Sequence, residues 1–420
     1  MLFISTRYCG SVTRTGRGRG REGAGLYPEL AVLGVSEGAS PALLSLVGRQ
    51  CALLPSYEMA RQELAAAGKP LGIKVVHRMA RILGAQVLTT RWRDVLAWRA
   101  GLLPAGRELA GKRVAAMIDG GRTRTRRVRR KQKGQGKKKT QRRRYEAEWR
   151  EPKLLIIFEM DEQGRMKRGT KPWIEGTFAG PDEVMELLAF HLHHLGAAAA
   201  ETVVFVADGA PWIWERLPWV WRRVGLSASR VTQVLDWCHA LHHVSLALEA
   251  VGLKDQERQH LYRKLKRWLY RGRPGLVVRE LERLGAKRHW PEKLEQPLEY
   301  LRKHMVARHM DYATYRRRGL PLGSGAIESA IRRVVNLRLK GPGLMWLEGN
   351  AEGALALRAV AVSGRWEETM AHVRETMSTD RRLVRQLPSA DIMEALKAEE
   401  SINPPDAQPE TNQGHQREAA

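Results

Sequence analysis

Glu328 is an acidic residue in a stretch whose apolar residues recur at helical spacing. Those apolar residues are Ile327, Ala330, Ile331, Val334 and Val335. Glu328 lies three and seven residues before Ile331 and Val335, so we expect its carboxylate to face inward on a helix. An ionised carboxylate removed from water is costly unless a cation pairs with it. The alternative is an exposed ion pair with Arg332, four residues later on the same helix.

Two aspartates each end an apolar run that is typical of a buried strand. Val114–Ile118 precedes Asp119, Thr202–Ala207 precedes Asp208, and a glycine follows each aspartate. A turn explains each aspartate taken alone, since Asp-Gly is a common turn signal. Two strand-end aspartates together with an inward glutamate can also hold two divalent ions roughly 3.5–4 Å apart, which activate an attacking oxygen and stabilise a leaving oxygen in phosphoryl displacement.

A further group of polar residues follows the apolar strand expected at Val231–Leu235. Asp236, His239 and His243 would share one face of the helix that begins near Trp237. Zinc would need another ligand from elsewhere in the chain, and histidines paired in a core or on a surface are the more frequent case.

The elements expected around these acids alternate in a regular order. They are strands at Val114–Asp119, Lys153–Asp161 and Trp173–Phe178, a helix from about 181 to 194, and strands at Thr202–Asp208 and Val231–Asp236. Three strands, a helix and two further strands predict an α/β core over residues 112–252 with acids at the ends of its first and fourth strands. Residues 319–360, which contain Glu328, would complete this core.

Helical segments are expected on both sides of the core. A domain at 39–108 would contain three helices, starting at Ser40-Pro41, at Ser56 and at Ile73, with the third ending near Leu83. This unit resembles a helix-turn-helix and would present Lys74, His77, Arg78 and Arg81 to DNA. A simple three-helix packing unit is the alternative. We also expect a helical insertion at 253–318 and further helices at 361–398.

Basic residues dominate Arg122–Arg144. Like charges at this density cannot pack into a core, so we expect residues 122–150 to form a solvated loop between two strands that lies along DNA. A generic nucleic-acid-binding tail is the alternative. The Gly/Arg-rich residues 1–38 and the polar tail 399–420 lack periodic apolar positions and are predicted to be disordered.

Composition favours a polyanionic partner. The chain has 420 residues and a formal net charge of +27, which points to nucleic acid. No uninterrupted apolar stretch of about 18 residues is present, so we expect no membrane span. The three cysteines, Cys9, Cys51 and Cys238, are too few and too scattered for a disulfide framework, and they fit a reducing cytosol.

Several motifs together resemble those of DDE transposases of bacterial insertion sequences, first the ISKra group and then the ISLre group. The motifs are Ile118-Asp119-Gly-Gly, Ala207-Asp208-Gly-Ala, Leu235-Asp-Trp-Cys-His239, Gly323-Ser-Gly-Ala-Ile-Glu328-Ser and Arg338-Leu-Lys-Gly-Pro-Gly-Leu-Met-Trp346. The resemblance covers roughly residues 25 to 360. It implies a ribonuclease H-like fold, which is a mixed five-stranded sheet flanked by helices, with a helical insertion before the last acid.

The resemblance also implies an activity and a set of site residues. Asp119, Asp208 and Glu328 would bind two Mg2+ ions, with Mn2+ as a substitute, for DNA strand cleavage and strand transfer at transposon ends. Asp236 and His239 would lie near the active site. The cations expected on DNA are Arg122, Arg124, Arg126, Arg127, Arg129, Arg130, Lys131, Arg332, Arg333, Arg338 and Lys340. The implied partners are double-stranded DNA and a second copy of the chain on it, in the cytoplasm at the nucleoid, with neither a membrane nor a nucleotide cofactor.

Two alternatives remain at this point. One is a catalytically inactive, transposon-derived DNA-binding protein, and the other is a structure-specific ribonuclease H-like nuclease that cuts branched DNA without joining strands.

Overall fold

The computed structural model describes residues 34–35, 38–128, 145–341 and 343–386. The chain divides into two units, Glu37–Val373 and a second that combines Met1–Ser36 with Arg374–Ala420. Only short parts of the second unit are described, so the fold below is that of the first. The disorder expected for residues 1–38 and 399–420 falls almost entirely outside the described ranges.

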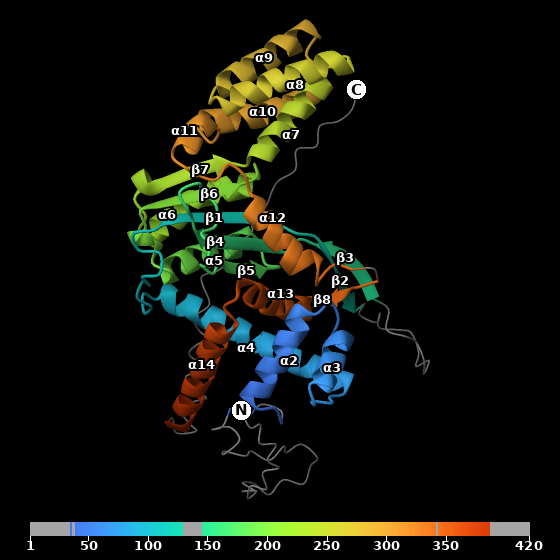
Figure 1. Cartoon of the computed structure of the whole chain (residues 1–420), viewed down its shortest axis with the longest axis vertical. Coiled ribbons are helices and arrows are strands. Elements are labelled where there is room, and N and C mark those ends of the chain that lie inside the picture. The colour runs from blue at the N-terminus through green and yellow to red at the C-terminus, as the bar shows by residue number, and fades with distance from the viewer. Residues whose placement is uncertain (1–33, 36–37, 129–144, 342, 387–420) are drawn as a thin grey trace, which may run out of the picture. The chain divides into compact units, whose positions relative to one another are not determined.

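A mixed five-stranded sheet forms the centre of this unit, as the sequence predicts (Figure 1). In spatial order its strands are β5 (Trp173–Thr177), β4 (Lys153–Glu159), β1 (Arg113–Gly120), β6 (Thr202–Ala207) and β7 (Val231–Leu235). β4 runs antiparallel to β1 and β5, whereas β1, β6 and β7 run parallel. Consecutive residues of β1, β4 and β6 are buried, because helices cover both faces of these strands.

The covering helices come from distant parts of the sequence. They are α5 (Pro181–His194), α6 (Pro211–Val224), α12 (Gly325–Ile331) and α13 (Glu348–Ser363), with short 3-10 turns η1 (Ala197–Ala199) and η2 (Ala228–Arg230). α12 packs on β1 and β4, α13 on β5, and α5 on β4. α12 continues into a π-helical turn, η3 (Arg332–Asn336). The last helix, α14 (Trp366–Gln386), follows α13.

Among the residues that the structure describes, three helices precede the sheet: α2 (Pro41–Leu53), α3 (Tyr57–Ala66) and α4 (Ile73–Arg99). The first two begin as predicted, because the hydroxyls of Ser40 and Ser56 cap them. The predicted end of the third helix at Leu83 is wrong. Gly84 does not stop it, since this glycine lets α4 approach Gly353 of α13, where an added Cβ would lie 3.1 Å from the Gly353 Cα.

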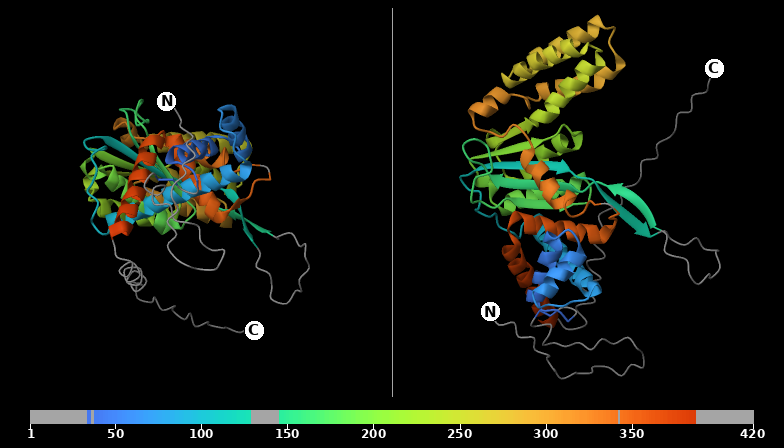
Figure 2. Two further views of the ribbon diagram at one scale, coloured as in Figure 1. Left: turned by 90° about the horizontal axis from the view of Figure 1, so that it is seen from below. Right: turned by 45° about the vertical axis from the view of Figure 1, so that its right-hand side comes forward.

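The basic segment expected as a loop at 122–150 forms strands at both ends. β2 (Thr123–Val128) pairs with β3 (Tyr145–Arg150), and β8 (Trp346–Leu347) adds to β2 (Figure 2). The high charge hides an alternation of period two, in which Thr123 and Thr125 are buried and Arg124 is exposed. The Thr123 hydroxyl donates to the Leu339 carbonyl at 2.7 Å. Residues 129–144 lie outside the described part.

The insertion expected at 253–318 is helical, as predicted. It comprises α8 (Asp255–Tyr270), α9 (Pro274–Lys287), α10 (Glu292–Val306) and α11 (Tyr312–Arg317). α10 packs on α7 (Trp237–Ala250), the helix that follows β7. None of the described helices combines the length and the apolarity needed to cross a membrane.

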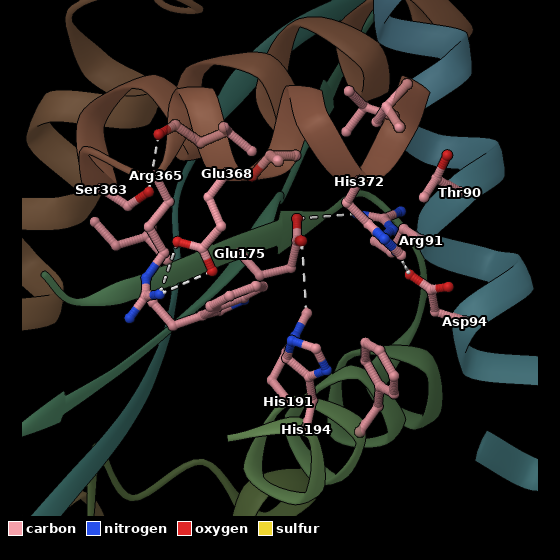
Figure 3. Close-up of a pocket in the computed structure, with 17 residues that line it drawn as sticks. Thr90, Arg91, Asp94, Glu175, His191, His194, Ser363, Arg365, Glu368 and His372 are labelled. Carbon is pink, nitrogen blue, oxygen red and sulfur yellow. Dashed lines mark hydrogen bonds and ion pairs between the residues drawn. The ribbon is translucent and has the colours of Figure 1, made fainter. Parts of the chain in front are cut away.

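A buried cation links α4 to the sheet and to α13. Arg91 pairs with Glu175 of β5 at 3.1 Å and with Glu352 at 3.0 Å, and its side chain is 4% exposed. His191 of α5 lies 3.6 Å from the Glu175 carboxylate. Arg91, Glu175 and His191 line a cavity of about 260 Å3 (Figure 3).

We predict that Arg91→Met lowers the free energy of unfolding by about 3–5 kcal/mol, because the substitution leaves two carboxylates without their cation. The double variant Arg91→Met/Glu175→Leu should recover part of this difference. Urea unfolding midpoints give the measurement. Arg61→Met, which removes an exposed ion pair with Glu58, is the control and should leave the midpoint unchanged. An equal response to both single substitutions would contradict the role of Arg91.

Candidate active site

Asp119 and Asp208 lie at the same edge of the sheet. Asp119 is the penultimate residue of β1, and Asp208 immediately follows β6. β1 and β6 are adjacent parallel strands with Ile118 opposite Ala207, so the next residue of each strand projects from the same end. Both aspartates are half-buried. The structure therefore brings together the two strand-end acids identified in the sequence.

The charges at this edge influence one another. Burial, together with the carboxylates of Asp208 and Glu328, raises the pKa of Asp119 to about 6. The Gly120 amide, which donates to Asp119 Oδ1 at 2.6 Å, and the nearby His239 act in the opposite direction. All three predicted acids are thus close enough to interact electrostatically.

The expectation that Glu328 faces inward is wrong. Glu328 lies in the first turn of α12 and is exposed, whereas Ile327 and Ile331 are buried. The spacing explains the error, because Glu328 directly follows Ile327 and so lies about 100° around the helix from it, at the edge of the apolar face. In the described part of the chain Glu328 forms no ion pair with Arg332, and its Oε1 instead accepts a hydrogen bond from Ser324 Oγ at 3.1 Å.

Asp236 directly follows β7, which runs parallel to β6 with Leu235 opposite Ala207, so it lies at the same edge of the sheet as Asp119 and Asp208. It caps α7 and is 1% exposed. Its Oδ1 accepts the His239 amide at 2.8 Å, and its Oδ2 accepts the amide and the hydroxyl of Ser324 at 2.6 and 2.8 Å. Burial alone would raise the pKa of Asp236, but these hydrogen bonds and the one from the His239 ring lower it to about 2. Asp236 is therefore ionised at neutral pH.

Ser324 connects Asp236 to Glu328, and the sequence reasoning missed it. Its hydroxyl lies within hydrogen-bond distance of both carboxylates, so it fixes the first turn of α12 against the start of α7. Gly323-Ser-Gly was the available signal, because a serine between glycines before a helix is a typical cap position.

His239 is held in a defined orientation by Asp236. Its Nδ1 lies 3.0 Å from Asp236 Oδ1, which requires the proton on Nδ1 and leaves Nε2 for proton exchange. The bond to Asp236 raises the pKa of His239, burial opposes this, and the charges of Asp208 and Asp119 raise it further. His243 does not contact Asp236 in this way, since its ring stacks on the Tyr300 ring with the two ring centres 3.5 Å apart. Asp236, His239 and His243 therefore do not form the zinc site that the sequence leaves as an alternative to paired histidines.

Tyr300 of the helical insertion also contacts the site, and nothing in the sequence marked it. The Tyr300 ring packs directly on Gly209, where an added Cβ would lie 1.8 Å from a ring carbon. Trp214 of α6 donates to the Asp208 carbonyl at 2.7 Å. The loop that carries Asp208 is thus held from one side by α6 and from the other by α10.

The basic side chains that the sequence predicts to contact DNA differ in their exposure to solvent. Arg122, Arg124, Arg127, Arg332 and Lys340 are exposed, whereas Arg126 and Arg333 are partly buried. Arg129, Arg130 and Lys131 lie outside the described residues. Arg338 departs from the prediction of a free surface cation, because it is 3% exposed and its Nε donates to the Cys51 carbonyl at 2.9 Å.

The donor set at the strand ends has the chemistry that magnesium prefers, namely carboxylate oxygens with uncompensated negative charge. The described residues nevertheless contain no group of three or more His, Cys, Asp and Glu side chains close enough to hold one metal ion. Asp119, Asp208 and Glu328 therefore interact through their charges without reaching a shared coordination distance in this structure.

Comparison with known proteins identifies no relative, since no protein-family model, no curated protein and no solved structure matches this chain significantly.

We predict that Asp236→Asn destabilises the protein by on the order of 2 kcal/mol at pH 7. The folded-state pKa of Asp236, about 2, lies below the ordinary value of 3.8, so its stabilisation is present above pH 4 and is lost as the pH falls through 2. Urea unfolding at pH 7 and pH 2.5 should show the difference from wild type shrinking in acid. Asp311→Asn, which removes another helix-capping carboxylate, is the control. A difference that does not change with pH would contradict this role.

We also predict that Gly209→Ala lowers the thermal midpoint, because the new methyl group collides with Tyr300. The same substitution should cost much less in a Tyr300→Ala background, which a double-mutant cycle measures. Gly325→Ala is the matched control, since no atom lies within 4 Å of its added Cβ. Additive effects of the two substitutions would show that Tyr300 does not constrain the Asp208 loop.

Proposed function

We propose that this protein is a DDE transposase that catalyses Mg2+-dependent DNA strand cleavage and strand transfer at insertion-sequence ends. The observation that carries the proposal is the placement of Asp119 and Asp208 at the neighbouring ends of the parallel strands β1 and β6, where the charge of Glu328 also acts on Asp119. The strand order β5-β4-β1-β6-β7, with three antiparallel and then two parallel strands, fits the expected ribonuclease H-like topology. We offer that fold as part of the proposal.

Asp119, Asp208 and Glu328 would hold the Mg2+ ions, for which Mn2+ can substitute. Bound there, the metal would activate the attacking oxygen and stabilise the leaving oxygen. The protein's own residues prepare this site. Asp236 fixes the Nδ1 proton of His239, which leaves Nε2 to take or give a proton beside Asp119 and Asp208. Ser324 orients Glu328 through its hydroxyl.

The substrate in this proposal is double-stranded DNA, bound by two copies of the chain at the nucleoid. The net charge of +27 supports a polyanion, and the exposed Arg122, Arg124 and Arg332 belong to elements adjoining the strand ends. The helical insertion would contribute further phosphate contacts, since exposed Arg and Lys residues line α8.

One observation favours a second candidate, a catalytically inactive DNA-binding protein. The carboxylates of the described residues are not gathered at metal-coordinating distance. Such a protein would bind DNA tightly and in a salt-sensitive manner but would not cut it.

The test uses a duplex that carries the DNA flanking the reading frame. Wild-type protein should cleave this duplex in the presence of Mg2+, and cleavage should stop when EDTA removes the metal. Asp119→Asn should reduce cleavage by at least about a hundredfold, since even residues behind metal ligands contribute 10–100-fold, while duplex affinity stays near the wild-type value.

Asp255→Asn, an exposed aspartate on α8, is the matched control and should cleave normally. Undiminished cleavage by Asp119→Asn would exclude the proposed metal site. Tight binding by an inert wild-type protein would favour the second candidate.

A further inference from the structure

A continuous basic groove lies between the amino-terminal helices and the region formed by β2, β8 and α13. Its larger part has a volume of about 630 Å3 and is lined by residues that include Tyr57, Arg126, Arg338 and Trp346. A second hollow of about 460 Å3 continues along α4, where Lys74 and Arg78 line it. His77, Arg81 and Asn350 line both parts, so we treat the two hollows as one basic groove.

Positive charge dominates this groove. Lys74, Arg78, Arg81, Arg126 and Arg338 all line it. The single acid among the lining residues is Glu58, which already forms an ion pair with Arg61 at 2.6 Å. A concave surface with this balance concentrates anions from solution.

Arg338 is a buried cation at the wall of the groove without a carboxylate partner in the described structure. Its guanidinium lies 4.8 Å from the Tyr57 ring centre and 4.9 Å from that of Trp346. Its Nη2 has no hydrogen-bond partner among the described residues. Burying a guanidinium without an acid is costly, and the two aromatic rings offset only part of the cost. A bound anion in the groove would offset more of it.

The groove also offers aromatic surface. The Tyr57 and His77 rings lie 4.1 Å apart, with Tyr57 partly buried and His77 exposed. A cationic channel combined with aromatic side chains is the arrangement that binds single-stranded nucleic acid, since phosphates follow the charges and bases stack on the rings. Reading the bases of a double helix instead needs a protruding element that enters its groove. Lys74, His77, Arg78 and Arg81, which the sequence predicts to belong to a helix-turn-helix, line the basic groove.

We propose that the basic groove binds a single-stranded segment of DNA, separate from the strand held at Asp119 and Asp208. The choice of DNA over RNA rests on the proposed function, whereas single-strand binding follows from the groove itself. The segment would be a strand unpaired beside the cleavage position. Arg81 and Arg126 would contact its phosphates, and His77 would stack on a base.

The test measures binding of a fluorescent oligothymidine at several salt concentrations, with full-length protein carrying Asp119→Asn so that no cleavage occurs. Arg81→Gln should lower the slope of log affinity against log salt by about 0.7 for each phosphate that the protein no longer neutralises. His77→Ala should weaken binding about fivefold or more, because a base can no longer stack on the imidazole ring. Arg168→Gln removes the same charge from an exposed position that does not line the groove, so it is the matched control.

Equal effects of Arg81→Gln and Arg168→Gln would overturn the proposal, as would a duplex of the same length that competes as well as the single strand. Tighter binding of the matching RNA would assign the groove to RNA instead. Because binding is measured without cleavage, a failure of the catalytic proposal would leave the single-strand result unaffected, and the reverse also holds.

Discussion

Electrostatic repulsion among carboxylates is the constraint on which the centre of this molecule depends. β1 and β6 run in parallel and end at the same edge, so Asp119 and Asp208 are brought together by strand pairing. α12 brings Glu328 close enough for its negative charge to act on Asp119. Burial of Asp119 makes the repulsion stronger, since little water screens it. Such an arrangement persists because strand pairing and a packed core hold it in place.

Asp236 and Ser324 convert this cluster into an ordered site. A buried carboxylate that accepts several hydrogen bonds remains ionised, and each donor is fixed in return. The bonds join the end of β7, the start of α7 and the start of α12. Tyr300 adds a second constraint from the insertion by packing on Gly209. The insertion therefore contributes to the position of Asp208 as well as to the surface.

Buried arginines attach the amino-terminal helices to the sheet. Arg91 connects α4 to β5 and α13 through two carboxylates. Arg338 and Arg358 act differently, because they donate to the Cys51, Ala52 and Leu53 carbonyls at the end of α2. Cations at the C-terminal end of a helix donate hydrogen bonds to its last carbonyls and interact favourably with the negative end of its dipole. Arg338, Cys51 and Ala52 also line the basic groove, so one of its cations is a residue that holds α2.

The sequence by itself determined the five strands and their order along the chain, the two strand-end aspartates and the helical insertion. These follow from local patterns, because apolar runs, turn residues and helix caps act within a few residues. It also determined the starts of α2 and α3 through Ser40 and Ser56. The strand β2 was within reach of the same reasoning, since the alternation in Thr123–Val128 is local, but the high charge of the segment concealed it.

Only the tertiary structure decided how Glu328 points, which residues organise it and where Arg338 lies. Ser324 meets Asp236 across 88 residues, and Arg338 meets Cys51 across 287. Side chains so far apart in the chain meet only after the helices have packed on the sheet. Glu328 lies at the edge of the apolar face of α12, and only the packing of α12 on β1 and β4 leaves its side chain exposed. The spacing of apolar residues predicts which face of a helix is buried, whereas tertiary packing decides how far around the helix the buried face extends.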